Sequence, residues 1–181
     1  MFSTQEVRIA NATSRSNGAS AKNKDGSIRA IVPRYVAEHV DKRDSILDYG
    51  AGKDAVHTKW LKESGFNVVA YDFGSNSIEG IHDKNALQKQ YKVIMASNVL
   101  NVSSSLGMLI TTLKQIYNSL EKGGIFVCNY PASPRKMPLL KAKDIQDIIK
   151  SIFKSEAEVV GGTSSAPLLI VKNIQEHDKM N

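Results

Sequence analysis

Glycines and aspartates in the first half of the chain have the types and spacing that suit binding of a nucleotide-like ligand. Gly50 and Gly52 flank Ala51, and Asp48 stands just before them at the end of an apolar run. Glycine lets the backbone adopt positive φ and approach a ligand closely, and a helix that begins after such a loop offers free N–H groups. Asp72 ends the next apolar run, so a second carboxylate is expected near the same loop.

The charges around this loop favour a cationic ligand group over a pyrophosphate. Dinucleotide-binding loops have the pattern G-x-G-x-x-G, with the pyrophosphate at the helix N-terminus, and here Ala55 stands at the third glycine position. Asp48 precedes the loop and Asp54 opens the following helix, so carboxylates flank the place of the phosphates. They would repel a phosphate and attract an amino group or a sulfonium. A nicotinamide (NAD)-dependent oxidoreductase is therefore the less favoured alternative.

Strand and helix patterns alternate along the chain around this loop. Because the strands are continuously apolar and the last two have a short connection, the pattern predicts an α/β three-layer sandwich, with a mostly parallel seven-strand sheet and a C-terminal antiparallel hairpin. The expected strands are 45–49, 67–73, 81–82, 91–99, 125–130, 158–160 and 168–172. One expected helix starts near Pro33, and three others cover 54–63, 106–120 and 144–154. In such sheets ligands bind at the carboxyl ends of the strands, where Asp48–Gly52, Asp72, Asp83, Ser97–Val99 and Tyr130 all fall.

The ordered set of motifs resembles the class I S-adenosylmethionine-dependent methyltransferases, which have a Rossmann-like fold. The motifs are the Asp48–Gly52 loop (DYGAG), the Tyr71-Asp72 pair, the YKVIMASNVL run from Tyr91 and the LEKGGIFV run from Leu120. The resemblance covers about residues 28–173 and includes the terminal hairpin. It implies that S-adenosylmethionine is the cofactor and that its methyl group moves by in-line displacement.

The resemblance also implies roles for residues at the carboxyl ends of the strands. Asp48 would lie near the methionine amino group, Asp72 would accept from the ribose hydroxyls, and Phe73 would pack near the adenine. The full set expected to bind the cofactor is Asp48, Gly50, Ala51, Gly52, Asp72, Phe73, Asp83, Lys84, Ser97, Asn98 and Val99. Because the segment of residues 74–90 is short, the usual helix there is expected to be reduced to a turn. The adenine side of the pocket is then expected to be open.

The sequence names candidates for catalysis without selecting one. A general base is needed only when the nucleophile must lose a proton. Asn98 and Tyr130 could hydrogen-bond a substrate, although Tyr130 could instead be a buried aromatic that ends its strand. His82 is near the expected pocket and could equally pack within the short third strand, whereas His57 is interpreted as a histidine on a helix face.

The methyl acceptor is expected to be anionic. The Asp/Asn-Pro-Pro-aromatic and Pro-Cys motifs of base methyltransferases are missing, since Ser97 to Leu100 and Val127-Cys128 stand in their places. Arg135 and Lys136 follow the fifth strand and suit a phosphate-bearing acceptor, either nucleic acid or a nucleotide-like molecule. A net charge of +6 points the same way. The missing motif also leaves open a non-catalytic, cofactor-binding regulatory or partner protein.

The chain is divided into three parts by composition. Residues 1–27 are polar and without sustained periodicity, which predicts a flexible arm or lid; residues 28–173 form the methyltransferase domain, and 174–181 a polar tail. No apolar run approaches the ~18 residues of a membrane span, and no signal-peptide pattern is visible, so a cytoplasmic protein is expected. A lone cysteine, Cys128, excludes an internal disulfide and a cysteine-based zinc cluster, and no metal is expected.

Overall fold

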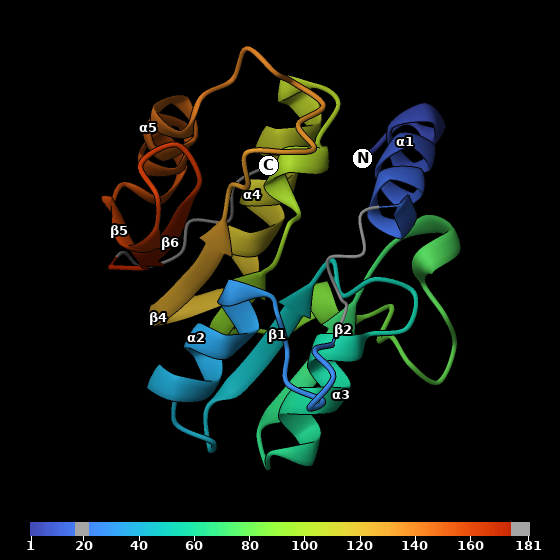
Figure 1. Cartoon of the computed structure of the whole chain (residues 1–181). Coiled ribbons are helices and arrows are strands. Elements are labelled where there is room, and N and C mark those ends of the chain that lie inside the picture. Colours follow the sequence, from blue (N-terminus) through green and yellow to red (C-terminus); the bar gives the residue numbers. More distant parts are fainter. Residues whose placement is uncertain (17–21, 175–181) are drawn as a thin grey trace.

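The computed structural model describes residues 1–16 and 22–174 and has one central sheet between layers of helices (Figure 1). Within those residues the sheet has six strands in the order β2-β1-β3-β4-β6-β5. The first four are parallel, and β6 runs antiparallel to both β4 and β5. The strands are β1 (Ser45–Tyr49), β2 (Asn67–Tyr71), β3 (Tyr91–Ala96), β4 (Leu120–Asn129), β5 (Ala157–Gly162) and β6 (Pro167–Lys172).

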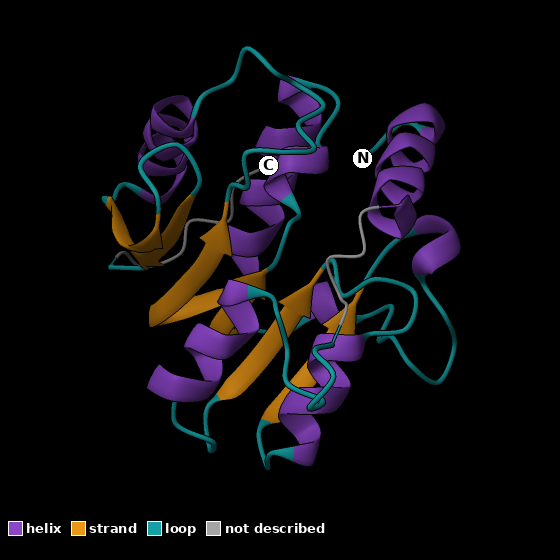
Figure 2. Cartoon of the chain, viewed as in Figure 1, coloured by secondary structure: helices purple, strands orange, loops and turns teal. Residues whose placement is uncertain are grey.

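The helices cover both faces of the sheet, as the apolar strands predicted. On one face, Val36 of α2 and Leu61 of α3 share one buried core cluster with Met95 of β3. On the other, Leu113 of α4 and Ile149 of α5 belong to the larger core. Figure 2 shows these layers, with helices in purple on either side of the orange strands. The helices are α2 (Ile31–His39), α3 (Val56–Glu63), α4 (Leu106–Ser119) and α5 (Ala142–Phe153). The α/β three-layer prediction is confirmed.

The expected third strand at Ile81–His82 is wrong, so the described sheet has six strands where seven were predicted. Gly80 has φ +83°, and the amides of Ile81 and His82 then both donate back to the carbonyl of Ile78. The chain therefore turns where it would have to extend. One backbone hydrogen bond, from Asp83 N to Ala70 O at 2.9 Å, ties this segment to β2.

Short 3-10 turns take the place of a helix between β2 and β3. They are η1 (Gly74–Asn76) and η2 (Ala86–Gln88), and a third turn, η3 (Leu100–Val102), follows β3. The expectation that the usual helix is reduced to a turn is confirmed. The loops between β2 and β3 are thus joined to the sheet by few regular hydrogen bonds.

The N-terminal segment contains a helix, α1 (Thr4–Ser16), where an irregular arm was expected. Its start is a capping box, in which Ser3 N donates to Glu6 Oε2 at 2.8 Å and Glu6 N donates to Ser3 Oγ at 3.2 Å. Figure 1 shows α1 in dark blue beyond the carboxyl ends of β1 and β2. The helix therefore lies over the edge of the sheet where a ligand was predicted. Among the described helices, none combines the length and the apolar character needed to cross a bilayer.

Candidate functional site

The loops after β1 and β3 meet where the strand order reverses, and a small cavity lies between them. After β1, the amides of Gly50 and Ala51 both donate to Tyr71 O, at 2.9 and 3.0 Å. This cavity, called the cleft cavity below, has a volume of about 30 Å³. It is lined by Ala10, Asn11, Gly50, Asp72, Phe73, Asn76, Asn98, Val99 and Val102. Five of the predicted cofactor residues are thus brought together here.

Gly50 is required by space as well as by backbone conformation. It has φ +76°, and a Cβ added there would lie 2.6 Å from Val99 Cγ2. Gly52 also has φ +76°, but nothing lies within 4 Å of its Cβ position. Ala51 is buried in a small cluster with Ala55 and Ala70, away from the lining of the cavity. The loop therefore presents its backbone to the cavity.

Asp72 is 6% exposed and holds the glycine loop through its carboxylate. Its Oδ2 accepts from Gly52 N at 2.7 Å and its Oδ1 from Phe73 N at 2.8 Å. Burial raises the pKa of Asp72, while the hydrogen bonds from Phe73 and Gly52 act to lower it. The amide of Asn76 also hydrogen-bonds to Asp72, and Asn76 Oδ1 is buried without a partner in the described residues. An unpaired acceptor beside a carboxylate suits a ligand that donates hydrogen bonds, such as a ribose.

Asp48 lies behind the loop and does not line the cleft cavity. It is 1% exposed, and its Oδ2 accepts from Thr58 Oγ1 of α3 at 2.7 Å. Burial raises the pKa of Asp48 to about 7, an effect that the hydrogen bond from Thr58 opposes. His57, expected on a helix face, is also buried, and burial lowers its pKa to about 4. Asp48 thus joins β1 to α3, and His57 is a second buried titratable group, on α3.

At the end of β3, Asn98 is fixed by a residue that the sequence reading missed. Asn98 N donates to Asn129 Oδ1 at 2.7 Å, and Asn129 Nδ2 donates to Asn98 Oδ1 at 2.9 Å. These bonds hold Asn98 at φ +57°, a rare conformation for a residue with a side chain. Ser97 Oγ is buried without a partner in the described residues. The sequence feature that could have identified Asn129 is its position, as an asparagine at the end of an otherwise apolar strand.

Two of the three catalytic candidates are already engaged with the backbone. Tyr130 is buried, and its hydroxyl donates to Leu140 O at 2.7 Å. The Nδ1 of His82 accepts from Ile78 N at 3.0 Å, and its Nε2 lies 2.8 Å from Gly52 O. Tyr130 is thus the buried aromatic of the alternative interpretation, and His82 has no free ring nitrogen. Asn98 remains as the candidate in the cleft cavity.

Asp83, the second acidic candidate on the β2 side, lies apart from Asp72 and the cleft cavity. Asp83 forms an ion pair with Lys89 at 2.7 Å and accepts from Asn85 N at 2.8 Å. Together with Lys84 and His82 it lines a separate hollow of about 400 Å³ in the 77–85 loop. The structure thus places Asp83 and Lys84 outside the cleft cavity, because the chain turns at Gly80 instead of extending beside β2.

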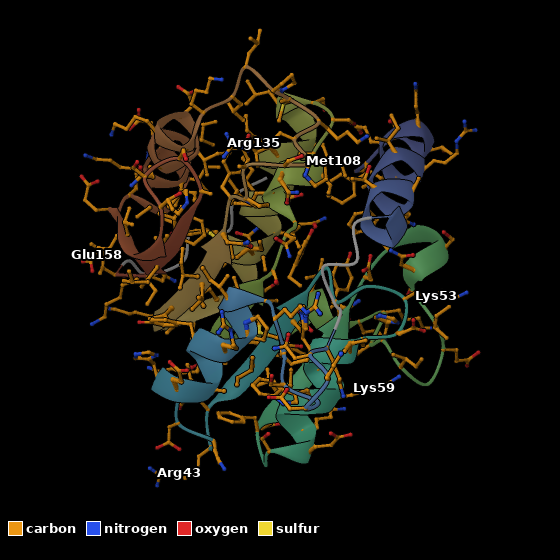
Figure 3. All side chains as sticks on the ribbon, viewed as in Figure 1. Arg43, Lys53, Lys59, Met108, Arg135 and Glu158 are labelled. Carbon is orange, nitrogen blue, oxygen red and sulfur yellow. The ribbon has the colours of Figure 1, made fainter. Side chains whose placement is uncertain are left out.

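The basic candidates after β4 also differ from each other. Arg135, labelled in Figure 3, donates to the carbonyls of Pro131 and Tyr130 at 2.8 and 3.2 Å and lies 4.0 Å from the Tyr130 ring centroid. Its guanidinium therefore holds the 131–140 loop, and its binding of substrate stays a prediction. The neighbouring Lys136 has an exposed side chain, while its backbone N donates to Asn101 O at 2.9 Å.

Lys136 and Arg8 line a second cavity, between α1 and the loop after β4. This cation cavity has a volume of about 370 Å³ and is completed by Ile9, Ala12 and Thr13. Among its five lining residues two are basic and none is acidic. The cavity therefore suits an anion.

The helix α1 is held over the cleft cavity by specific contacts. Asn11 Nδ2 donates to Phe73 O and to Ser75 Oγ, both at 3.2 Å. The Glu6 carboxylate accepts from the hydroxyl of Ser105, which is the N-cap of α4. The rings of Phe2 and Phe73 pack with their centroids 5.0 Å apart and their planes tilted by 49°. One face of α1 thus closes the cleft cavity, and another face lines the cation cavity.

Comparisons with known proteins agree with this arrangement. The sequence matches the family model for a methyltransferase domain over residues 13–155. A TehB-like S-adenosylmethionine-dependent methyltransferase from Corynebacterium glutamicum superposes with a TM-score of 0.63 at 14% identity, covering 82% of this chain and 90% of that one. A methyltransferase from Bacteroides fragilis, in complex with S-adenosylhomocysteine, gives a TM-score of 0.59 at 16% identity over 78% and 76% of the two chains.

A third similar structure is the magnesium protoporphyrin IX methyltransferase from Synechocystis PCC 6803 with bound S-adenosylmethionine. Its TM-score is 0.57 at 13% identity, and the match covers 93% of this chain and 82% of that one. No protein of curated function matches the sequence. At these identities the structural matches show the fold, and the family model covers most of the chain. The chain belongs to the methyltransferase domain family and is an S-adenosylmethionine-dependent methyltransferase.

Proposed function

We propose that this methyltransferase acts on a small, phosphate-bearing acceptor of nucleotide size that binds in the cation cavity. The observation that carries the proposal is the pairing of Arg8 and Lys136 around a hollow of about 370 Å³. Two like charges facing one space repel each other, and an anion between them relieves this repulsion. The volume falls within the roughly 300–1,000 Å³ of small-molecule sites, which favours a nucleotide-like molecule over a nucleic acid chain.

The position of the cation cavity supports the same proposal. Arg8, Ile9, Ala12 and Thr13 lie on α1, whose neighbouring residues Ala10 and Asn11 line the cleft cavity. The backbone N of Lys136 donates to Asn101 O, and Val102, which follows Asn101, lines the cleft cavity. An acceptor anchored by its anionic group is therefore held next to the cofactor, as methyl transfer requires.

The cofactor itself is proposed to occupy the cleft cavity once α1 has moved. Asp72 and Asn76 offer acceptors for the ribose hydroxyls, and the backbone at Gly50 passes under the methionine. Asn98 and Val99 border the methyl end, and Phe73 packs by the adenine. The bound cofactor supplies an already activated methyl group, so the chain mainly contributes orientation and exclusion of water.

Residues 1–27 are proposed to act as a lid. The cleft cavity of about 30 Å³ is far smaller than the roughly 300 Å³ at the lower end of ligand sites. Asn11, Val7 and Glu6 make the contacts that close it. Entry of the cofactor therefore requires α1 to separate from η1, and closure afterwards shields the reacting groups from water.

The test is a labelled-methyl assay across pools of nucleotides, phosphorylated metabolites, RNA, DNA, protein and neutral metabolites. We expect label in the nucleotide or phosphorylated pool. For that acceptor, Arg8→Ala and Lys136→Ala should each raise KM about tenfold, the loss of one charge-assisted hydrogen bond. Binding of S-adenosylhomocysteine should stay unchanged.

Matched controls remove the same charges elsewhere. Arg43, which pairs with Asp41 at 2.7 Å, and Lys59 on α3 are both exposed and are labelled in Figure 3. Arg43→Ala and Lys59→Ala should leave the acceptor KM within about twofold, since neither residue lines the cation cavity and exposed charges are screened by salt. Label confined to neutral acceptors, or to RNA or DNA, would contradict the proposal.

A further inference from the structure

The imidazole of His82 is engaged on both sides by the backbone. Nδ1 lies 3.0 Å from Ile78 N, which is an N–H donor, so Nδ1 must be the unprotonated, accepting nitrogen. Nε2 lies 2.8 Å from Gly52 O, which can only accept, so Nε2 must carry the hydrogen. The two contacts together select one neutral tautomer. They also join the 77–85 loop to the glycine loop after β1.

Gly52 is held from two directions by side chains. Its N–H donates to Asp72 Oδ2 at 2.7 Å, and its carbonyl accepts from His82 Nε2 at 2.8 Å. Its φ is +76°, and glycine adopts positive and negative φ about equally readily, so the residue itself does not fix this backbone conformation. No atom lies within 4 Å of its Cβ position, leaving out its chain neighbours, so packing does not fix it there. Ala55 N also donates to Gly52 O, at 3.1 Å. These three hydrogen bonds hold the two peptide groups on either side of Gly52, and the one from His82 ties them to the 77–85 loop.

The surrounding fold explains why a side chain performs this task. Residues 81–82 lie in a turn where a short strand was expected, and Asp83 N is joined to β2 by the hydrogen bond to Ala70 O. A sheet neighbour for β2 would brace the adjacent loop by its regular ladder of bonds. In its absence, His82 provides the direct link from this segment to the glycine loop.

We propose that His82 is a positioning residue that, through Gly52, sets the geometry of the glycine loop for the cofactor and does not act as a general base. Gly50 of this loop lines the cleft cavity. This inference rests on the proposed place of the cofactor in the cleft cavity. It does not depend on the anionic acceptor, because it is tested by binding of S-adenosylhomocysteine alone.

The test compares substitutions that each retain one of the two contacts. In His82→Gln, the amide nitrogen reaches the place of Nε2 and can still donate to Gly52 O. In His82→Asn, the shorter amide can still accept from Ile78 N but loses Gly52. We expect His82→Asn and His82→Ala to weaken S-adenosylhomocysteine binding about tenfold, the value of one hydrogen bond, and His82→Gln to weaken it less than about threefold.

The matched control is His39→Ala. His39 is an exposed histidine whose Nδ1 lies 2.9 Å from Tyr35 O within its own helix, away from the cleft cavity. Its loss should leave the affinity unchanged. Wild-type affinity in His82→Asn would overturn the proposal, and so would an affinity of His82→Gln as low as that of His82→Ala.

A spectroscopic measurement on the wild-type protein keeps the inference testable if a variant fails to fold. Long-range ¹H–¹⁵N spectra separate the protonated from the unprotonated ring nitrogen of a histidine. We expect His82 to give a fixed Nε2–H tautomer, and His82→Gln to retain the Gly52 amide resonance of wild type while His82→Ala shifts it. A rapidly exchanging mixture of tautomers at His82 would overturn the proposal.

Discussion

The two sides of the cleft cavity are held in different ways. On the β3 side, Asn98 and Asn129 exchange two hydrogen bonds between adjacent strand ends, and Val99 belongs to the large core. On the β2 side, Asp72 is surrounded by short turns that are attached through individual side chains such as His82 and Asn11.

This difference indicates how each side should respond to substitution. Contacts within the sheet and core break only when the whole domain unfolds, whereas loops with few bonds open locally at lower free energy. Substitutions on the β3 side should therefore lower the free energy of unfolding together with ligand affinity. Substitutions on the β2 side should mainly lower ligand affinity.

The largest effect is expected at Gly50, where the loop after β1 touches the β3 side. Gly50→Ala places a Cβ 2.6 Å from Val99 Cγ2 at a φ of +76°. We expect S-adenosylhomocysteine binding to weaken more than about 100-fold and the free energy of unfolding to fall by about 1–3 kcal/mol. Calorimetry and denaturant unfolding measure the two. Gly26→Ala, at φ +82° with nothing within 4 Å, is the control for backbone strain alone; equal losses in both variants would show that the contact with Val99 is unimportant.

The next effect is expected at Asp72 on the β2 side. Asp72→Asn replaces one of the two accepting oxygens by an NH2 group, so only one of Gly52 N and Phe73 N keeps its acceptor. Binding of S-adenosylhomocysteine should weaken about 30-fold, while the free energy of unfolding changes by less than about 1 kcal/mol. Asp83→Asn is the matched control, since Asp83 is paired with Lys89 outside the cleft cavity. A comparable loss of affinity in the control would mean that the ligand extends into the 77–85 hollow.

A smaller effect on affinity, with a larger effect on the free energy of unfolding, is expected on the β3 side. Asn129→Ala removes both bonds to Asn98 and leaves the Asn98 N–H without its acceptor. The free energy of unfolding should fall by about 1–3 kcal/mol, with at most about a tenfold loss of affinity. Asn67→Ala, at the exposed start of β2, should match wild type. Full stability of Asn129→Ala in chemical denaturation would show that the two sides do not differ as described.

The smallest effect concerns pH and two buried groups, Asp48 on β1 and His57 on α3. Burial raises the pKa of Asp48 to about 7 and lowers that of His57 to about 4. Folded Asp48 keeps a proton that the unfolded chain releases, so its contribution to stability is lost as pH rises from about 4 to about 7. Unfolded His57 gains a proton that the folded chain excludes, so its contribution is lost as pH falls from 6.5 to about 4. The two trends oppose each other in wild type.

The variant that separates these trends is Asp48→Asn. Without the Asp48 carboxyl, the free energy of unfolding should fall by up to about 1 kcal/mol per pH unit as pH drops below 6.5. Wild type should vary less over this window in denaturant titrations at fixed ionic strength. His57→Gln should show the reverse trend, a loss of stability as pH rises. Identical pH profiles for wild type and Asp48→Asn would refute this balance of buried groups.

The parts of the fold with strong local patterns were predictable from the sequence. Apolar runs placed β1 and β2 closely, and the glycine spacing placed the loop at Gly50, because both signals depend on neighbouring residues alone. The helix α1 was missed although Ser3 and Glu6 form a capping box. Its polar composition hides a narrow contact face, and that face packs against η1, η3 and the start of α4.

The roles of individual polar side chains were less predictable. Tyr130 and Arg135 read as substrate contacts because they follow β4, yet the guanidinium lies on the Tyr130 ring and bonds to nearby carbonyls. His82 read as a base or a strand residue, and its partners are Ile78 N and Gly52 O. Backbone partners leave no trace in residue types, so the three-dimensional path of the chain must be known first.

The double use of α1 has a kinetic consequence. Four of the five residues that line the cation cavity belong to α1. If α1 is displaced to admit the cofactor, as we propose, this cavity does not exist at that stage. An enzyme with this arrangement should follow a compulsory order, in which the cofactor enters first, the acceptor enters second and S-adenosylhomocysteine leaves last. Product inhibition by S-adenosylhomocysteine should then be competitive with the cofactor and noncompetitive with the acceptor.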